Sequence, residues 1–180
     1  KGNTDFWVFK LNAKGDEQWQ RTLGGTGQEE LLSVFQTTDG GYILGGSSSS
    51  DATLTTTAKN ALTTTQKDLT AKSSNSRGNM DYWIVKLNAQ GEVQWQKTYG
   101  GKYADELRSM EQTKDGGYIL GGYSNSPQSG DKTQPSIGIG DYWVVKIDNL
   151  GTIEWQRTYG GNGDNQLYVI HQTGDEGYLI

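Results

Sequence analysis

The sequence predicts an all-β fold in which one four-stranded unit occurs three times. Residues 5–46 align without a gap to residues 81–122, and residues 141–180 repeat most of the same pattern. The predicted strands mix β-branched, aromatic and polar residues, which suits a pleated and half-buried surface. The chain contains 26 glycines and 2 prolines, as expected for short strands that are joined by tight turns.

Each strand of the unit can be justified in residues 81–122. The first strand is expected at residues 81–87, DYWIVKL, and its bulky side chains on both faces indicate a sheet packed between two others. An Asn-Ala-Gln-Gly turn leads to the second strand, EVQWQKTY. A Gly-Gly loop precedes the third, DELRSMEQT, and an Asp-Gly turn leads to the fourth, YILGG. The glycines of this last strand leave room for the close approach of another sheet.

Residues 47–80 and 123–140 are expected to be insertions between repeats. The first is rich in Ser and Thr and predicts a solvated loop, in which residues 54–57 and 62–65 pair as a partial ribbon. A wholly disordered segment is the alternative. The second insertion holds both prolines, which predicts irregular structure. Because the insertions do not recur, we expect function to reside there.

A four-stranded repeat of this kind predicts a β-propeller of four-stranded antiparallel blades, with a β-solenoid as the alternative. We expect each blade to begin after the Gly-Gly loop. The chain then begins with the outer half of a blade, residues 5–23, and ends with the inner half of another, residues 167–180. Residues 1–180 thus form one segment of a larger ring, because propellers usually close with four to eight blades. A longer chain is expected to complete the ring, and assembly from several chains is the alternative.

The repeated unit resembles the SBBP β-propeller repeat family of secreted Bacteroidota proteins. The matching residues are Asp81, Trp83, Val85, Lys86, Leu87, Gly91, Trp95, Gly100, Gly101, Asp105, Asp115, Gly116 and Gly121. The third repeat departs at Glu176, where the others have Gly, and its turn type is left open. The resemblance implies a secreted or cell-surface bacterial protein.

A more distant likeness concerns residues 86–95, KLNAQGEVQW, which are similar to the docking stretch of pyrroloquinoline-quinone-type propeller blades. In those blades a Trp of the outermost strand packs on the adjacent blade. We therefore expect the six Trp residues to pack between blades. They are Trp7, Trp19, Trp83, Trp95, Trp143 and Trp155.

Composition excludes several classes of partner and chemistry. The formal net charge of −5 disfavours nucleic acid, which needs a basic surface. No apolar run is long enough for membrane insertion, and no signal peptide is expected at the start, so we expect a mature or internal piece of a longer chain. With no Cys, the sequence has no disulfide, thiolate metal site or Cys nucleophile.

Polar residues that recur in every repeat are expected to belong to the scaffold. The recurring acids are Asp5, Asp81 and Asp141, and the recurring lysines are Lys10, Lys86 and Lys146. We interpret the acids as caps of strands or turns, and we expect the lysine stems to pack on aromatic rings.

Residues that occur once are the candidates for activity. His171 is the only His and is expected to be an ordinary strand residue, because no Ser/His/Asp arrangement accompanies it. Ca²⁺ at residues 160–165 is the one metal alternative, and no catalytic, cofactor-binding or metal-ligating residue is predicted. Tyr103, Tyr123 and Tyr168 are the possible ligand or partner contacts, with packing between blades as the alternative.

The expected function is therefore non-catalytic: binding, adhesion or assembly by a propeller segment at the cell surface. The expected partners are a protein or glycan there, together with other blades of the same longer chain. A glycan-binding or glycan-cleaving module is the alternative. A quinone-dependent dehydrogenase ranks last, because only the Trp hairpin suggests it.

Overall fold

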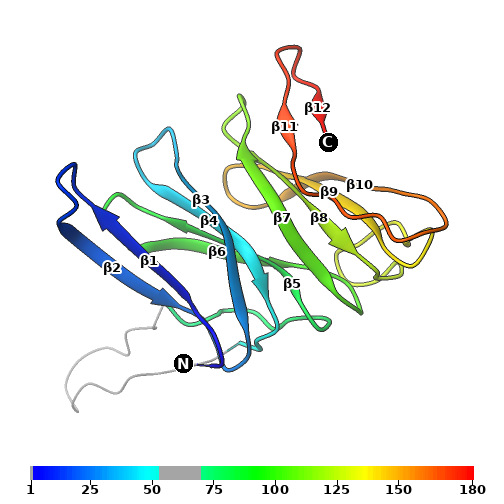
Figure 1. Cartoon of the computed structure of the whole chain (residues 1–180), viewed down its shortest axis with the longest axis horizontal. Helices are drawn as coiled ribbons and strands as arrows, with labels where there is room; N and C mark the ends of the chain where they lie inside the picture. The colour runs from blue at the N-terminus through cyan, green and yellow to red at the C-terminus, as the bar shows by residue number, and fades with distance from the viewer. Residues whose placement is uncertain (1, 53–69) are drawn as a thin grey trace.

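The computed structural model describes residues 2–52 and 70–180, and within these ranges the chain is all-β (Figure 1). The ribbon expected at residues 54–57 and 62–65 lies outside the described residues. The described strands form two four-stranded and two two-stranded antiparallel sheets. No helix in the described ranges has the length and apolar character needed to cross a membrane.

The strand order confirms that each four-stranded sheet begins after a Gly-Gly loop. Sheet A contains β3 (Glu29–Gln36), β4 (Tyr42–Ser48), β5 (Asp81–Leu87) and β6 (Val93–Tyr99), in that order. Sheet B contains β7 (Asp105–Gln112), β8 (Tyr118–Ser124), β9 (Asp141–Ile147) and β10 (Ile153–Tyr159). The sequence repeat and the sheet are therefore offset by two strands.

Two hairpins lie at the ends of the array (Figure 1). The N-terminal hairpin consists of β1 (Phe6–Leu11) and β2 (Glu17–Leu23) and corresponds to the last two strands of a sheet. The C-terminal hairpin consists of β11 (His171–Gln172) and β12 (Tyr178–Leu179) and corresponds to the first two. Within the described residues the sheets do not close on one another, so the array is open.

The tight turns between paired strands form at short polar residues followed by Gly. In the turn between β5 and β6, the side-chain oxygen of Asn88 accepts backbone N–H groups from Gln90 and Glu92, and Gly91 adopts a φ of 73°. The Asp-Gly turns hold the same conformation even where the sequence changes. Glu176 replaces the first Gly and still adopts a φ of 68°.

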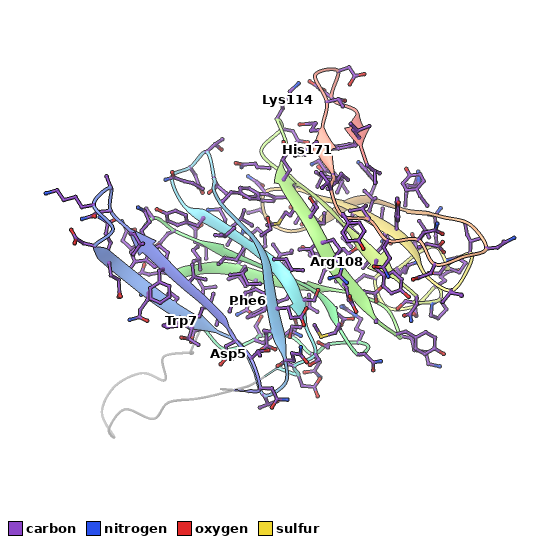
Figure 2. The ribbon with its side chains drawn as sticks, in the orientation of Figure 1. Asp5, Phe6, Trp7, Arg108, Lys114 and His171 are labelled. Atoms are coloured by element: carbon purple, nitrogen blue, oxygen red, sulfur yellow. The ribbon has the colours of Figure 1, made fainter. Side chains whose placement is uncertain are left out.

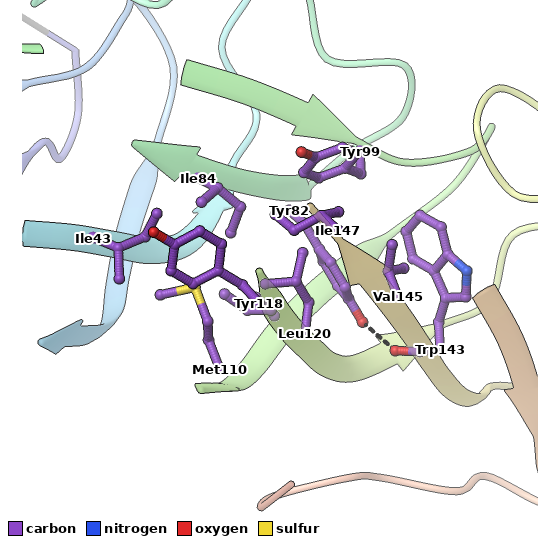
Figure 3. Packing of buried hydrophobic residues seen from close by; sticks show 11 residues of the cluster. Ile43, Tyr82, Ile84, Tyr99, Met110, Tyr118, Leu120, Trp143, Val145 and Ile147 are labelled. Atoms are coloured by element: carbon purple, nitrogen blue, oxygen red, sulfur yellow. Dashed lines mark hydrogen bonds between the residues drawn. The ribbon is translucent and has the colours of Figure 1, made fainter. Parts of the chain in front are cut away.

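The hydrophobic cores lie between successive sheets rather than inside one sheet (Figure 3). Sheet A and sheet B meet through Tyr82 and Trp143, whose ring centroids are 4.9 Å apart. The Tyr82 hydroxyl also donates a hydrogen bond of 2.9 Å to the Trp143 carbonyl oxygen. On its other face, sheet A packs against the N-terminal hairpin through Trp83 and Phe6, at 4.6 Å. A repeat of this kind is stabilised mainly by its contacts with the next one.

The Trp residues occupy two recurring places. On the outer strands, Trp19, Trp95 and Trp155 lie edge-on to Tyr residues of the following sheet or hairpin. On the third strands, Trp83 and Trp143 are fully buried between sheets. Trp7 differs, because its side chain is 61% exposed. For Trp7 the expected packing between sheets does not occur within the described residues, since no sheet precedes the N-terminal hairpin there.

Candidate functional site

Two of the three recurring lysines, Lys86 and Lys146, form ion pairs inside their sheets, which the sequence did not predict. Lys86 is 4% exposed, and its Nζ lies 2.8 Å from Oδ2 of Asp39 in the first turn of sheet A. Lys146 makes the equivalent contact of 2.9 Å with Asp115 in sheet B. The hydrogen bond from Lys86 is the main reason that the pKa of Asp39 falls to about 2. Each pair joins the third strand of a sheet to the turn between its first two strands.

The recurring acids at the starts of the third strands, Asp81 and Asp141, cap the loops that lead into those strands. The Oδ2 of Asp81 accepts a hydrogen bond from the backbone N–H of Arg77. Its Oδ1 lies against Gly100, where an added Cβ would come within 2.0 Å of that oxygen. Burial raises the pKa of Asp81 to about 7. These contacts support the interpretation that Asp81 caps a loop.

A second row of acids begins the first strands. Asp105 is buried, and its Oδ2 accepts hydrogen bonds from the Gly101 N–H at 2.7 Å and the Ser126 hydroxyl at 2.8 Å. Oδ1 atoms of Asp81, Asp105 and Asp141 have no hydrogen-bond partner among the described residues. Those residues contain no group of three or more acidic, His or Cys side chains that could hold a metal ion.

The ends of the two insertions recur in space, which corrects the expectation that the insertions are unlike each other. Ser76 donates its hydroxyl to the Ser48 carbonyl, and Ser136 donates to the Ser124 carbonyl, both at 2.8 Å. Lys72 and Lys132 each stand nine residues before a strand-starting Asp and are both buried. Lys72 donates to the Ser50 carbonyl at 2.6 Å, and Lys132 donates to the Gln134 carbonyl at 2.6 Å. This part of each insertion therefore belongs to the scaffold.

Several side chains that do not recur lie on the first strands of the sheets or just before them. Leu32, Arg108 and Tyr168 occupy the same repeat position, as do Phe35, Glu111 and His171. The Ile170 N–H donates to the Ser109 hydroxyl at 3.2 Å, which holds residues 168–170 beside β7. We name the surface formed by Glu106, Arg108, Glu111, Tyr168 and His171 the first-strand surface.

Arg108 is one of the residues of this surface that reasoning from the sequence missed, together with Glu106 and Glu111. Its guanidinium forms a 2.5 Å ion pair with Glu106, and its Nε is buried without a hydrogen-bond partner among the described residues. Figure 2 shows Arg108 on β7 and His171 on β11. The signal was available, because Arg108 aligns with Leu32 and Tyr168, which share neither its charge nor its shape.

His171 is a strand residue, and it contacts the neighbouring sheet. Its Nδ1 lies 3.3 Å from Oε2 of Glu111, and the same oxygen accepts the Gln172 N–H at 2.8 Å. The pair is ionic only when the His is protonated. Its side chain is exposed. The contact therefore links the C-terminal hairpin to β7 on an accessible surface.

The three Tyr residues expected to contact a ligand are not brought together by a ring contact. Tyr103 lies in the loop before β7, with Lys102 Nζ 5.6 Å from its ring centroid, and is 47% exposed. Tyr123 lies on β8 and is half-buried, and its ring covers Gly140. Tyr168 is 70% exposed. Of the three, only Tyr168 belongs to the first-strand surface.

The fold and these contacts define an all-β repeat protein whose recurring polar groups hold its sheets and loops together. No family model matches the chain. The chain is 27% identical over 175 residues to a protein titled regulatory protein FlaEY from Caulobacter vibrioides. The match covers 97% of this chain and 16% of that protein. The chain thus spans about a sixth of the length of this relative.

Proposed function

We propose that the chain is a non-catalytic β-propeller segment of a secreted or cell-surface bacterial protein and that it serves binding, adhesion or assembly. One observation carries the proposal. The recurring acids and lysines of the complete sheets contact other parts of the scaffold, whereas several polar and aromatic groups that do not recur lie on the first-strand surface, where Tyr168 and His171 are exposed. A varied surface on a constant scaffold is suited to recognition.

The strand order supports the propeller part of the proposal. Two complete four-stranded sheets stand side by side with cores between them, and each end of the array carries half a sheet (Figure 1). Closed propellers consist of such sheets, usually four to eight of them. Other blades of a longer chain are accordingly among the proposed partners, because unpaired strand edges are normally covered.

The groups of the first-strand surface suggest the chemistry of an external partner. Tyr168 offers an exposed ring, and Arg108 offers a charged guanidinium whose buried Nε has no partner among the described residues. Tyr and Arg are enriched where proteins bind one another. We propose a protein with an apolar patch that carries hydrogen-bond acceptors as the main class of partner.

A glycan is the second candidate, because the exposed rings of Tyr103 and Tyr168 could stack on sugars. Binding is favoured over cleavage. Hydrolysis needs two carboxyl groups that flank one bond. The recurring acid Glu92 accepts a hydrogen bond from Asn88, and Glu154 accepts one from Lys146. These contacts leave the two acids in separate hairpins of the scaffold.

The proposal is tested by presenting the chain to an array of cell-surface proteins and glycans. Arg108→Ala and Tyr168→Ala should each weaken binding about tenfold, as expected for a residue that contributes about 1.4 kcal/mol. Leu150→Ala, at an exposed turn away from the first-strand surface, is the matched control and should bind like the wild type. Equal binding by all variants would remove the first-strand surface from the proposal.

Two further measurements test the non-catalytic role and the localisation in this proposal. Bound glycans and proteins should be recovered chemically unchanged, as judged by mass spectrometry, because the proposed role is non-catalytic. Fractionation of cells that express the complete gene product should place it in the medium or at the surface. Cleavage of a bound molecule would contradict the first expectation, and retention inside the cell would contradict the second.

A further inference from the structure

Two fully buried carboxyl groups lie where the strand starts of sheet A and sheet B meet. Asp81 begins β5 of sheet A and Asp105 begins β7 of sheet B, and the exposed fraction of each is 0%. The Asp105 N–H donates to the Met80 carbonyl at 2.6 Å, which joins the starts of the two strands. Asp81 Oδ1 lies against Gly100 in the loop between the sheets, and Asp105 Oδ2 accepts a hydrogen bond from the next N–H of that loop. Two acids from different sheets therefore hold one short loop.

The same arrangement recurs at the junctions on either side. Between the N-terminal hairpin and sheet A, a Cβ added to the loop Gly would come within 2.0 Å of Asp5 Oδ1 and 2.5 Å of Glu29 Oε2. Between sheet B and the C-terminal hairpin, it would come within 1.7 Å of Asp141 Oδ1 and 2.9 Å of Asn165 Oδ1. An amide is uncharged and similar in shape to a carboxyl group. The third junction therefore keeps the contact with one acid in place of two.

The cations that face Asp81 and Asp105 form their own contacts elsewhere. The two lysines donate to backbone carbonyl and hydroxyl oxygens, and Arg77 forms an ion pair of 2.6 Å with Asp131. Among the described residues, no ion pair within 4.0 Å involves Asp81 or Asp105. Two negative charges in this junction would therefore lack full compensation. The facing cations are Lys72 and Arg77 near Asp81, and Lys132 near Asp105.

Hydrogen bonds distinguish the two acids. The Asp105 carboxylate accepts the Gly101 N–H at 2.7 Å and the Ser126 hydroxyl at 2.8 Å, and such bonds favour its charged form. Asp81 accepts the Arg77 N–H through Oδ2, and its Oδ1 is buried with no hydrogen-bond partner among the described residues. Burial is the main reason that the pKa of Asp81 rises to about 7, and the charge of Asp105 contributes to the rise. Asp81 is therefore the acid that takes up a proton.

The loop at residues 100–104 depends on both strand starts. The Ser126 hydroxyl that donates to Asp105 also accepts the Tyr103 N–H at 2.9 Å. The Tyr103 carbonyl packs on Gly78, where an added Cβ would come within 1.8 Å of it, in the segment that leads to β5. The Tyr103 ring is 47% exposed. A change in the distance between the two strand starts would therefore move a loop that carries an exposed aromatic ring.

We propose that Asp81 and Asp105 form a proton-binding site between sheets A and B, with Asp81 neutral and Asp105 charged, and that loss of this proton to the solvent loosens residues 100–104. Ionisation of Asp81 places a second negative charge near Asp105 in a fully buried site, where like charges repel strongly. The repulsion falls if the starts of β5 and β7 separate, which frees the loop that carries Tyr103. The loop is therefore held at low pH and loosens as the pH rises through about 7.

The carbon-13 chemical shift of Asp81 Cγ reads the protonation of this site directly. Its midpoint should lie near pH 7 in the wild type. Asp105→Asn should move the midpoint to lower pH by about one unit, as expected for two coupled acids. This variant should fold, because Asn165 at the equivalent position accepts the Gly161 N–H at 3.0 Å in the same way. Glu17→Gln is the control: it removes one charge at an exposed position on β2 and should leave the midpoint unchanged.

Amide hydrogen exchange tests the loop. Protection factors correct for the intrinsic effect of pH on exchange, and those of Gly101 and Tyr103 should fall about tenfold between pH 6 and pH 8 in the wild type. Asp81→Asn should show equal protection of both amides at the two pH values, because its side chain stays neutral. The Thr113 amide, which bonds within the turn between β7 and β8, is the internal control and should keep its protection.

Three outcomes would overturn the proposal. An Asp81 midpoint near the ordinary value of 3.8 would show that the junction holds no proton at neutral pH. An unchanged midpoint in Asp105→Asn would show that the two acids do not act together. Equal protection of Tyr103 at pH 6 and pH 8 in the wild type would show that the loop does not respond to the site. None of these measurements uses an external partner, so the proposed function and this proposal can fail independently.

Discussion

The complete sheets and the terminal hairpins have nearly the same local sequence and differ in what surrounds them. Trp83 is 1% exposed in sheet A, whereas Trp7 at the same repeat position is 61% exposed in the N-terminal hairpin. Lys86 forms an ion pair with a turn Asp, and Lys10 donates to its own neighbouring carbonyl. The strands and turns are therefore set locally, while burial and ion pairing depend on an adjacent sheet. This is the behaviour expected of a repeat array with nearest-neighbour stabilisation.

The largest expected difference between the two regions is in the Trp residues. Trp83→Ala should lower the free energy of unfolding by about 3–5 kcal/mol, because it empties the core between sheet A and the N-terminal hairpin. Trp7→Ala should change it by no more than about 0.5 kcal/mol in dilute protein, because its ring is exposed. Urea unfolding followed by circular dichroism measures both. Similar losses for the two variants would contradict the nearest-neighbour description.

The buried Asp81 predicts a dependence of stability on pH. Its pKa is raised from 3.8 to about 7 by burial, so the folded protein holds an extra proton between these values. Stability contributed by this group is present at low pH and is lost as the pH rises through about 7. Asp81→Asn should remove this loss and gain up to about 4 kcal/mol relative to wild type between pH 4 and pH 8. Urea midpoints across this pH range measure the difference.

Asp81→Asn is compared with the wild type at each pH. An unchanged dependence of stability on pH in this variant would show that burial of the Asp81 carboxyl does not cause the effect.

The ion pairs predict a smaller difference. Asp39→Asn should cost about 1 kcal/mol at pH 7, a value reduced from the pKa shift because the Asp39 carboxylate is partly exposed. Its pKa is lowered from 3.8 to about 2, so this stability is present above pH 4 and lost as the pH falls through about 2. Asp175→Asn should cost less in dilute protein, since the lysine partner is missing there. Unfolding at pH 7 and pH 2 tests both variants.

The strands, turns and offset of the sheets could be predicted from the sequence because each depends on local patterns. Bulk on both faces of residues 81–87 predicted packing on two sides, and β5 is buried throughout. The pairing of Lys86 with Asp39 could not be predicted, because the two residues lie far apart along the chain and meet only when β4 pairs with β5. The role of Lys72 could not be predicted for the same reason. Its acceptor, the Ser50 carbonyl, lies at the other end of the insertion, and the length of this insertion differs between repeats.

Arg108 shows how far the first-strand surface could be predicted from the sequence. The alignment of the repeats shows that this position varies, and variation marks a surface not required by the scaffold. It does not show that residues 168–170 lie beside β7, because that placement depends on contacts between distant residues. The Ile170 N–H donates to the Ser109 hydroxyl, and Ile170 is buried in a core cluster with Ile119 of sheet B. Candidate contacts such as Tyr103 and Tyr168 therefore look equivalent in the sequence and occupy different surfaces in the fold.

The smallest expected effect concerns the turn at Glu176, whose φ of 68° lies in the left-handed region where the complete sheets have Gly40 and Gly116. A non-Gly residue in this conformation costs about 1 kcal/mol. Glu176→Gly should therefore stabilise the C-terminal hairpin by about that amount, and Gly116→Glu should destabilise sheet B by a similar amount. Amide hydrogen exchange at Thr173 and Thr113, which both close these turns through backbone hydrogen bonds, reads each hairpin separately. Faster exchange at Thr173 in Glu176→Gly would mean that the turn is held by its surroundings and not by its own conformational preference.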